Sequence, residues 1–163
     1  MRPTWADIDL NAIAQNVETL ARHAAPAEVC AVVKADGYGH GAVPVARAAV
    51  EAGATWLAVA LVEEGRILRD AGVRAPILTL SEPRPLEMVE VVEYELTPSL
   101  YSGEGLAAAA AAAMQRGIRL PIQLKIDTGM GRVGAKPEDA VPMADAIADK
   151  TSLELGGVWT LSL

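Results

Sequence analysis

The sequence predicts an α/β fold in which parallel β-strands alternate with α-helices. Short apolar runs recur along the chain at intervals of about 20 to 30 residues, and a helical pattern follows each of them, which is the spacing of βαβ units. Linkers are short, and no Ser- or Gly-rich boundary divides the 163 residues, so we expect a single domain over residues 1–163. Two architectures fit this pattern: a doubly wound open sheet, or a (β/α)8 barrel that stops early, since a complete barrel needs about 250 residues.

The N-terminal third begins with an alternating segment. Residues 4–10 alternate apolar and acidic side chains, which predicts a strand with one face in water. Asn11 is expected to cap a helix that Pro26 ends. An apolar run with adjacent β-branched residues then leads up to Lys34 and predicts a buried strand. A glycine-rich turn separates this strand from a helix over residues 43–52.

The same unit recurs through the rest of the chain. Further strands are expected over residues 55–60, 76–80, 96–100, 118–127 and 153–160. Helices are expected between them over residues 63–71, 86–94, 102–117 and 137–149. The strand over residues 96–100 is the weakest of these predictions, because Pro98 cannot donate a hydrogen bond to a sheet. Residues 28–160 thus contain about six βα units.

Composition excludes several classes of function. The net charge is −7 and no basic cluster occurs, so we expect neither a nucleic-acid partner nor an anionic membrane surface. The longest apolar run, residues 106–114, is shorter than the roughly 18 residues of a membrane helix. With no signal-peptide pattern, a cytoplasmic protein is expected. The single Cys30 allows no disulfide or zinc spacing, and it is expected to be a small core residue.

Lys34 is the first candidate for chemistry. It stands at the end of a predicted buried strand, and α/β folds keep their active sites at the carboxyl ends of such strands. A lysine there can act as a nucleophile that forms a Schiff base; alternatively, it marks the strand end and extends to water. Tyr38 lies between two glycines, where its hydroxyl could reach a phosphate. His40 is expected to bond to the local backbone.

A second constellation follows the strand predicted over residues 118–127. Three glycines match the G-x-G-x-x-G pattern of dinucleotide binding: Gly129, Gly131 and Gly134. That interpretation is disfavoured, because the next helix is expected to begin beyond the third glycine. Lys125 and Asp127 lie on one strand face, and Arg132 could clamp a carboxylate or a phenolate oxygen. Alternatively, Asp127 and Arg132 only order the loop.

The two motifs together resemble the N-terminal signatures of the alanine racemase family. They are VKADGYGHG over residues 33–41 and KIDTGMGRVG over residues 125–134, and residues 4–10 and 96–99 are similar to family segments as well. The resemblance implies a pyridoxal 5′-phosphate (PLP) enzyme on a (β/α)8 barrel followed by a β domain, acting as a homodimer. It also implies the interconversion of L- and D-alanine by a two-base mechanism, which supplies D-alanine for peptidoglycan.

The resemblance assigns roles to individual residues. Lys34 would hold PLP covalently and act as the base on one face of the substrate α-carbon. Arg132 would contact the phenolic oxygen of PLP and the substrate carboxylate, and Tyr38 would help to hold the phosphate. Lys125 matches a position that is carbamylated in many members, and Leu80 matches a residue of the cofactor pocket. No metal is implied.

The sequence also departs from the family pattern. Leu161 stands where the family has a histidine packed on the cofactor ring, and the tyrosine that a partner subunit supplies as second base would lie in a part that this sequence does not contain. The expectation is therefore a truncated racemase that lacks the second base and the β domain, and that self-associates. The alternative is a catalytically inactive PLP-binding or interaction module.

Overall fold

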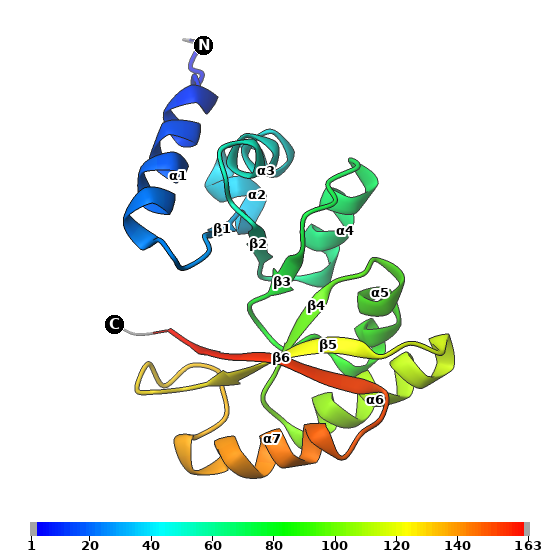
Figure 1. The fold of residues 1–163 in the computed structure, drawn as a ribbon. Coiled ribbons are helices and arrows are strands. Elements are labelled where there is room, and N and C mark those ends of the chain that lie inside the picture. The colour runs from blue at the N-terminus through cyan, green and yellow to red at the C-terminus, as the bar shows by residue number, and fades with distance from the viewer. Residues whose placement is uncertain (1–2, 162–163) are drawn as a thin grey trace.

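The computed structural model describes residues 3–161, which form one open, six-stranded parallel sheet (Figure 1). The strands are β1 (Cys30–Val32), β2 (Trp56–Val59), β3 (Ile77–Thr79), β4 (Thr97–Leu100), β5 (Leu120–Ile126) and β6 (Leu153–Thr160). Each strand pairs in parallel with the next one along the chain. A doubly wound sheet reverses its strand order at a switch point, whereas the strands of a (β/α)8 barrel follow in sequence. The order therefore identifies the N-terminal part of a barrel.

Helices connect the strands. They are α1 (Leu10–Ala24), α2 (Lys34–Gly39), α3 (Ala42–Glu51), α4 (Val62–Asp70), α5 (Met88–Glu93), α6 (Gly103–Arg116) and α7 (Ala140–Ala148), with short 3-10 helices η1 (Pro85–Glu87) and η2 (Pro137–Asp139) before α5 and α7. Helices α4, α5 and α6 follow one another along one side of the sheet in Figure 1. No helix of residues 3–161 is long and apolar enough to cross a membrane. The predicted alternation of strands and helices over residues 28–160 is confirmed.

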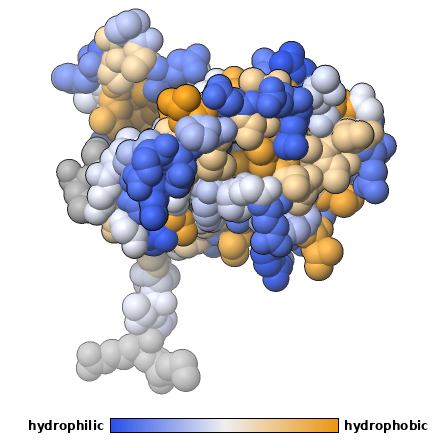
Figure 2. Space-filling model, turned by 90° about the horizontal axis from the view of Figure 1, so that it is seen from below, coloured by the Kyte–Doolittle hydropathy of each residue, from blue (hydrophilic) through white to orange (hydrophobic). Residues whose placement is uncertain are grey.

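The main core lies between the sheet and these helices. Its largest fully buried side chains are Leu57, Leu68, Ile77, Met88, Leu96, Leu100, Ile122, Leu124, Ile147, Leu153, Val33 and Val59. In α6, Ala109 and Ala113 lie one turn apart and are completely buried. Small side chains of this kind let the α6 backbone pack closely on its neighbours, and alanine is also the best helix former. On the face around α7, hydrophobic residues are interspersed with hydrophilic ones (Figure 2).

Strand β4 forms despite Pro98. Its first half pairs with β3 through Thr97 and Pro98, and its second half pairs with β5 through Ser99 and Leu100. Each of these two ladders is only two residues long, so the backbone N–H that Pro98 lacks removes little of the hydrogen bonding of the sheet. All four residues of β4 are buried.

The strand predicted over residues 4–10 is wrong. Residues 3–9 form neither helix nor strand, and α1 already begins at Leu10. Alternation is a local pattern, whereas a strand requires a neighbour to share its hydrogen bonds, and no strand of the described chain pairs with this segment. The helix cap is Asp9 rather than Asn11, because the Asp9 carboxylate accepts hydrogen bonds from the backbone N–H groups of Asn11 and Ala12 at 2.9 and 3.1 Å.

The expectation that Cys30 lies in the core is also wrong. Cys30 and Val32 are exposed, whereas Ala31 between them packs against the small cluster that α1 and α3 form. Side chains alternate between the two faces of a strand, so Cys30 and Val32 lie on the face opposite these helices. An apolar run does not distinguish a strand that is covered on both faces from one that is covered on only one.

Candidate active site

The predicted site residues come from the carboxyl ends of three strands. Lys34 follows β1, Leu80 follows β3, and Lys125 lies near the end of β5, with Arg132 in the loop beyond. Burial lowers the pKa of Lys125, the positive charges of Arg132 and Lys34 lower it further, and the Asp127 carboxylate opposes the shift. The fold therefore brings three cationic side chains together at the carboxyl ends of the strands.

Lys34 opens a left-handed turn. Residues 35–38 all have left-handed backbone angles, with φ between 51 and 61°. Three of them, Ala35, Asp36 and Tyr38, are not glycine. Each non-glycine residue in a left-handed helix costs about 1–2 kcal/mol of free energy, because its Cβ crowds the following carbonyl oxygen. Strain of this kind persists only where surrounding contacts fix the backbone.

Hydrogen bonds within the segment hold part of this turn. The Gly37 N–H donates to the Val33 carbonyl at 2.9 Å, and the Gly41 N–H donates to the Asp36 carbonyl at 2.8 Å. The Asp36 carboxylate accepts from the first N–H of α3, that of Ala42, at 2.8 Å. The turn thus leads directly into α3.

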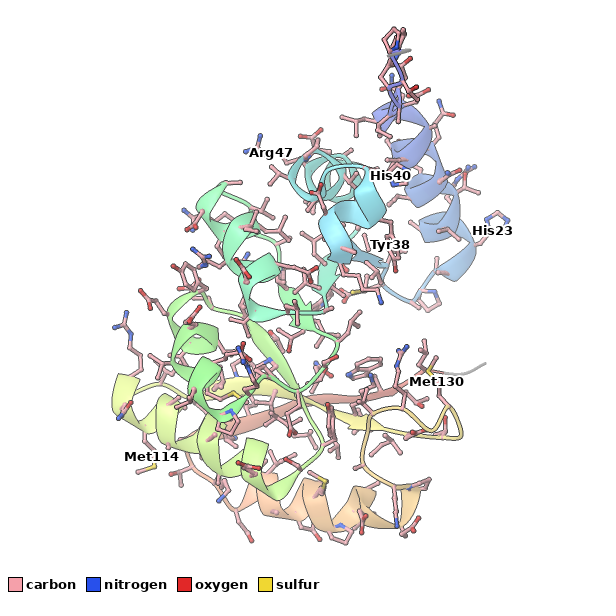
Figure 3. All side chains as sticks on the ribbon, turned by 180° about the vertical axis from the view of Figure 1, so that it is seen from behind. His23, Tyr38, His40, Arg47, Met114 and Met130 are labelled. Atoms are coloured by element: carbon pink, nitrogen blue, oxygen red, sulfur yellow. The ribbon has the colours of Figure 1, made fainter. Side chains whose placement is uncertain are left out.

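Tyr38 and His40 both belong to this turn but differ in their surroundings (Figure 3). Tyr38 is 58% exposed, and the Lys34 ammonium lies 5.9 Å from the centre of its ring. The phenol therefore stands beside the lysine and is open to a ligand. His40 Nδ1 lies 2.8 Å from the Gly37 carbonyl oxygen, so the expected local backbone bond is confirmed.

Lys125 is a buried amine. The residue is only 4% exposed, and its Nζ donates to the Leu80 carbonyl at 2.9 Å. The same Nζ lies 4.4 Å from the centre of the Trp159 ring, whose indole N–H donates to Ser99 Oγ at 3.1 Å. Trp159 therefore contacts the Lys125 amine and is itself held by Ser99. Leu80 contributes its backbone carbonyl, a role that the sequence did not reveal.

Asp127 orders the loop that carries Arg132. Its carboxylate accepts hydrogen bonds from the backbone N–H groups of Gly129, Gly131 and Arg132 at 2.9, 3.0 and 3.0 Å. These bonds to the charged form lower the pKa of Asp127. A Cβ on Gly134 would stand 2.6 Å from the Asp127 nitrogen, so only glycine fits there. Asp127 therefore orders the loop, as the alternative supposed, while the role of the Arg132 side chain stays a prediction.

The same loop does not have the geometry of a dinucleotide site. The N–H groups of Gly129 and Gly131 already donate to Asp127, and α7 begins only at Ala140, after the short helix η2. A dinucleotide fingerprint instead leaves N–H groups free at the start of a helix, where they bind a pyrophosphate. The disfavoured dinucleotide interpretation is not supported.

Two glutamates near the site escaped the sequence analysis. The first, Glu64 in α4, accepts hydrogen bonds from the backbone N–H groups of Ala35, Ala60 and Leu61 at 2.7, 2.8 and 3.0 Å. Glu64 stands three residues after the residue that precedes α4, which is the spacing of a capping box. That spacing is visible in the sequence, but it predicts only bonds at the start of α4 and not the bond to Ala35.

The second is Glu82, which follows β3. Its carboxylate accepts from the backbone N–H groups of Tyr101 and Ser102 at 2.6 and 2.9 Å, and from Ser102 Oγ. A Cβ on Gly105 would lie 2.4 Å from the Glu82 carboxyl carbon. Glu82 therefore fixes the start of α6 in the way that Glu64 fixes the turn after β1. Among residues 3–161, no cluster of three or more His, Cys, Asp or Glu side chains could hold a metal ion.

Comparisons with a family model and with individual sequences identify the same family. The model of the family described as "Alanine racemase, N-terminal domain" matches residues 8–162. The alanine racemase of Symbiobacterium thermophilum is 46% identical over 160 residues, which are 98% of this chain and 42% of that protein. The alanine racemase of Desulforamulus reducens is 44% identical over 160 residues, covering 97% of this chain and 43% of that protein.

Solved structures agree with the sequence comparison. Alanine racemase of Clostridium difficile 630 superposes with a TM-score of 0.88 at 32% identity, over 98% of this chain and 43% of that one. Alanine racemase from the D-cycloserine producer Streptomyces lavendulae gives a TM-score of 0.87 at 40% identity, over the same shares of 98% and 43%. The chain thus spans less than half the length of these relatives. It belongs to the alanine racemase family and corresponds to the N-terminal domain of that family.

Proposed function

We propose that this chain carries the PLP-binding lysine and the first catalytic base of an alanine racemase. The observation that carries the proposal is the grouping of Lys34, Lys125 and Arg132 at the carboxyl ends of the strands, on a chain of this family. The substrate would be alanine, and the reaction the interconversion of its L and D forms. A homodimer acting in the cytoplasm is part of the same proposal and rests on the family resemblance.

The residues present fit PLP by their chemistry. The cofactor has an aldehyde, a phenolic oxygen and a phosphate, and the site offers a primary amine, a guanidinium and a phenol hydroxyl. Lys34 would attach the aldehyde, Arg132 would face the phenolic oxygen, and Tyr38 would help to hold the phosphate. Leu80, whose carbonyl holds Lys125, would form part of the pocket wall.

The residues of the site would divide the steps of the reaction between them. When bound, PLP draws electron density away from the substrate α-carbon and so makes its proton easier to remove. The substrate amine would first replace Lys34 on the cofactor, and the freed Nζ would then take that proton on one face, while Arg132 binds the substrate carboxylate with paired donors. Racemisation needs a second base on the opposite face, and by family resemblance we assign it to a tyrosine of a partner subunit.

Lys125 would be modified to a carbamate. Carbon dioxide reacts with a neutral amine, and burial together with the charges of Arg132 and Lys34 lowers the pKa of Lys125. A carbamate would place a negative charge close to Arg132 and so hold its guanidinium in position. Carbamylation would thus replace the repulsion between the Lys125 ammonium and the Arg132 guanidinium with an ion pair.

The test is reduction of the protein with borohydride in the presence of PLP, followed by peptide mass mapping. The expected adduct lies on Lys34 and is lost in Lys34→Ala, whereas Lys136→Ala, which removes an exposed lysine, leaves it unchanged. Labelling spread over the four lysines, or absent, would contradict the proposal. An adduct at Lys34 without alanine racemisation by the isolated chain would favour the alternative of a PLP-binding module.

A further inference from the structure

We infer that Glu64 is a positioning residue that sets the direction of the Lys34 side chain. The inference rests on the proposed function of Lys34 and goes beyond it by naming the group that holds the lysine in place. Glu64 lies in the first turn of α4, one strand away from Lys34 in the sheet. Its Oε1 accepts from the Ala35 N–H at 2.7 Å, and its Oε2 accepts from Ala60 and Leu61.

The position of Ala35 in the chain makes this contact important. Ala35 directly follows Lys34 and is the first residue in the left-handed conformation, with φ at 51°. On the other side of the lysine, the Val33 N–H donates to the Ala58 carbonyl of β2 at 2.8 Å. Lys34 is therefore held on both sides by hydrogen bonds to the segment that β2 and α4 form. The bonds made by Gly37 and Gly41, in contrast, join only residues of the turn and its close neighbours.

The contact depends on both oxygens of a carboxylate. Glutamate accepts with two oxygens, and here one oxygen serves the turn after β1 while the other serves the turn after β2. Glutamine has the same shape but only one acceptor oxygen, so its NH2 group must face an N–H on one of the two sides. The oxygen keeps two bonds if it faces Ala60 and Leu61, so we expect the Ala35 N–H to lose its acceptor. Glu64→Gln therefore breaks the link between the two turns without removing side-chain volume.

The neighbouring residue supplies a matched control. Glu63 lies in the same helical turn, its side chain is 71% exposed, and it contacts Arg66 at 3.6 Å. Glu63→Gln removes the same charge from the start of α4, but no hydrogen bond joins Glu63 to the Lys34 turn. A difference between the two variants thus reports the bond to Ala35 and not the loss of a charge near the helix N-terminus.

Two measurements on the full chain test the inference. By NMR, hydrogen exchange at the Ala35 amide should be faster by roughly tenfold or more in Glu64→Gln, which is the effect of losing a hydrogen bond to a charged group. Borohydride reduction with PLP should label Lys34 several-fold less, relative to Lys136 in the same sample. Glu63→Gln should change neither. General loosening of the fold would alter labelling of both lysines alike, whereas a positioning role affects only Lys34.

The outcomes separate this inference from the proposed function. Unchanged Ala35 exchange together with unchanged Lys34 labelling in Glu64→Gln would overturn the inference. Absence of a Lys34 adduct in the unmodified chain would overturn the proposed function, while Ala35 exchange would still decide whether Glu64 holds the turn. If Glu64→Gln does not fold, NMR of the unmodified chain still decides the question. A scalar coupling across the hydrogen bond should join the Ala35 nitrogen to the Glu64 carboxyl carbon, and its absence would contradict the link.

Discussion

Lys125 and Trp159 face each other as register partners across β5 and β6, with the Lys125 Nζ 4.4 Å from the centre of the Trp159 ring. The ring offers a buried ammonium a partial replacement for lost water, because its face attracts a cation. The indole is held in turn by its hydrogen bond to Ser99. The pair thus keeps an amine buried at the site without a carboxylate in direct contact, and the pKa of Lys125 is lowered mainly by this burial.

We expect Lys125 to react with carbon dioxide at lower pH than an exposed lysine does. A lowered pKa means that the neutral amine, which is the reactive form, is populated at lower pH. Carbon-13 NMR in labelled bicarbonate should therefore detect a carbamate that disappears in Lys125→Met and remains in Lys136→Ala. A carbamate signal that persists in Lys125→Met would show that another amine carries it.

Asp127→Asn should loosen the loop that presents Arg132. Asparagine keeps one acceptor oxygen, whereas the carboxylate accepts with both, so at least one backbone bond is lost. Amide exchange at Gly129, Gly131 and Arg132 should become faster. Asp145→Asn, on the exposed surface of α7, is the matched control and should leave these amides unchanged.

The same bonds predict the pH dependence of the loop. The pKa of Asp127 in the folded chain lies below its ordinary value of 3.8, so the charged form is the one that stabilises the loop. This stabilisation is complete above the ordinary value and is lost as the pH falls through the lower, folded-state pKa. Protection of the loop amides should therefore survive at pH 4 and disappear only under stronger acid. Loss of protection already near pH 5 would contradict this assignment.

The sequence predicted the alternation of parallel strands and helices, because this alternation depends on local patterns. Apolar runs at βαβ spacing leave the strand order open between a doubly wound sheet and a barrel that stops early, and only the family resemblance of the two motifs favours the barrel. The left-handed turn after Lys34 was not predictable, since Ala35 and Tyr38 have no intrinsic preference for it. One of the bonds that hold it runs from the Ala35 N–H to Glu64, which lies 29 residues away in the sequence.

The errors have the same origin. The alternation over residues 4–10 predicts a strand, but the residues beside a segment decide whether it forms one. The apolar run around Cys30 predicts a core residue, but such a run does not reveal which face of the strand is covered. Glu64 and Glu82 were missed because a glutamate that accepts several backbone N–H groups looks, in sequence, like any surface glutamate. In each case the outcome depends on contacts between segments that are distant in the sequence, and a local pattern does not reveal such contacts.

Arg69→Leu should destabilise the chain by about 2–4 kcal/mol, because it leaves several carbonyl groups without their donor. The guanidinium donates to four backbone carbonyls, those of Tyr94, Val73, Ala75 and Glu95, at 2.9, 2.9, 2.8 and 3.0 Å. It thereby joins α4 to the segments before β3 and β4. Urea unfolding measures the loss, and Arg74→Leu, at an exposed neighbouring position, should cost much less. Equal costs for the two variants would mean that the four bonds contribute little.

Cys30 should react slowly with alkylating reagents although the residue is exposed. Desolvation raises the pKa of its thiol from an ordinary 9.0 to about 11, and only the thiolate is the nucleophile. Two pKa units correspond to a thiolate fraction about 100-fold smaller at pH 8. Iodoacetamide labelling should be roughly tenfold slower than for a free cysteine, because the thiolate with the higher pKa is also the stronger nucleophile, and the rate should still rise above pH 9. A rate equal to that of the protein denatured in urea would contradict the raised pKa.

The isolated chain should self-associate. β1 and β6 are the edges of an open sheet, and each edge has unpaired backbone donors and acceptors that can pair with another copy. Val158 on β6 is 58% exposed, so this edge is apolar as well. Val158→Lys should shift the chain toward monomer in light scattering, because a lysine on an edge strand opposes pairing. Val89→Lys is the control, since Val89 is 57% exposed but lies on α5, which joins the interior strands β3 and β4. An unmodified chain that is monomeric at all concentrations would contradict the prediction, and equal effects of the two lysines would place the contact elsewhere.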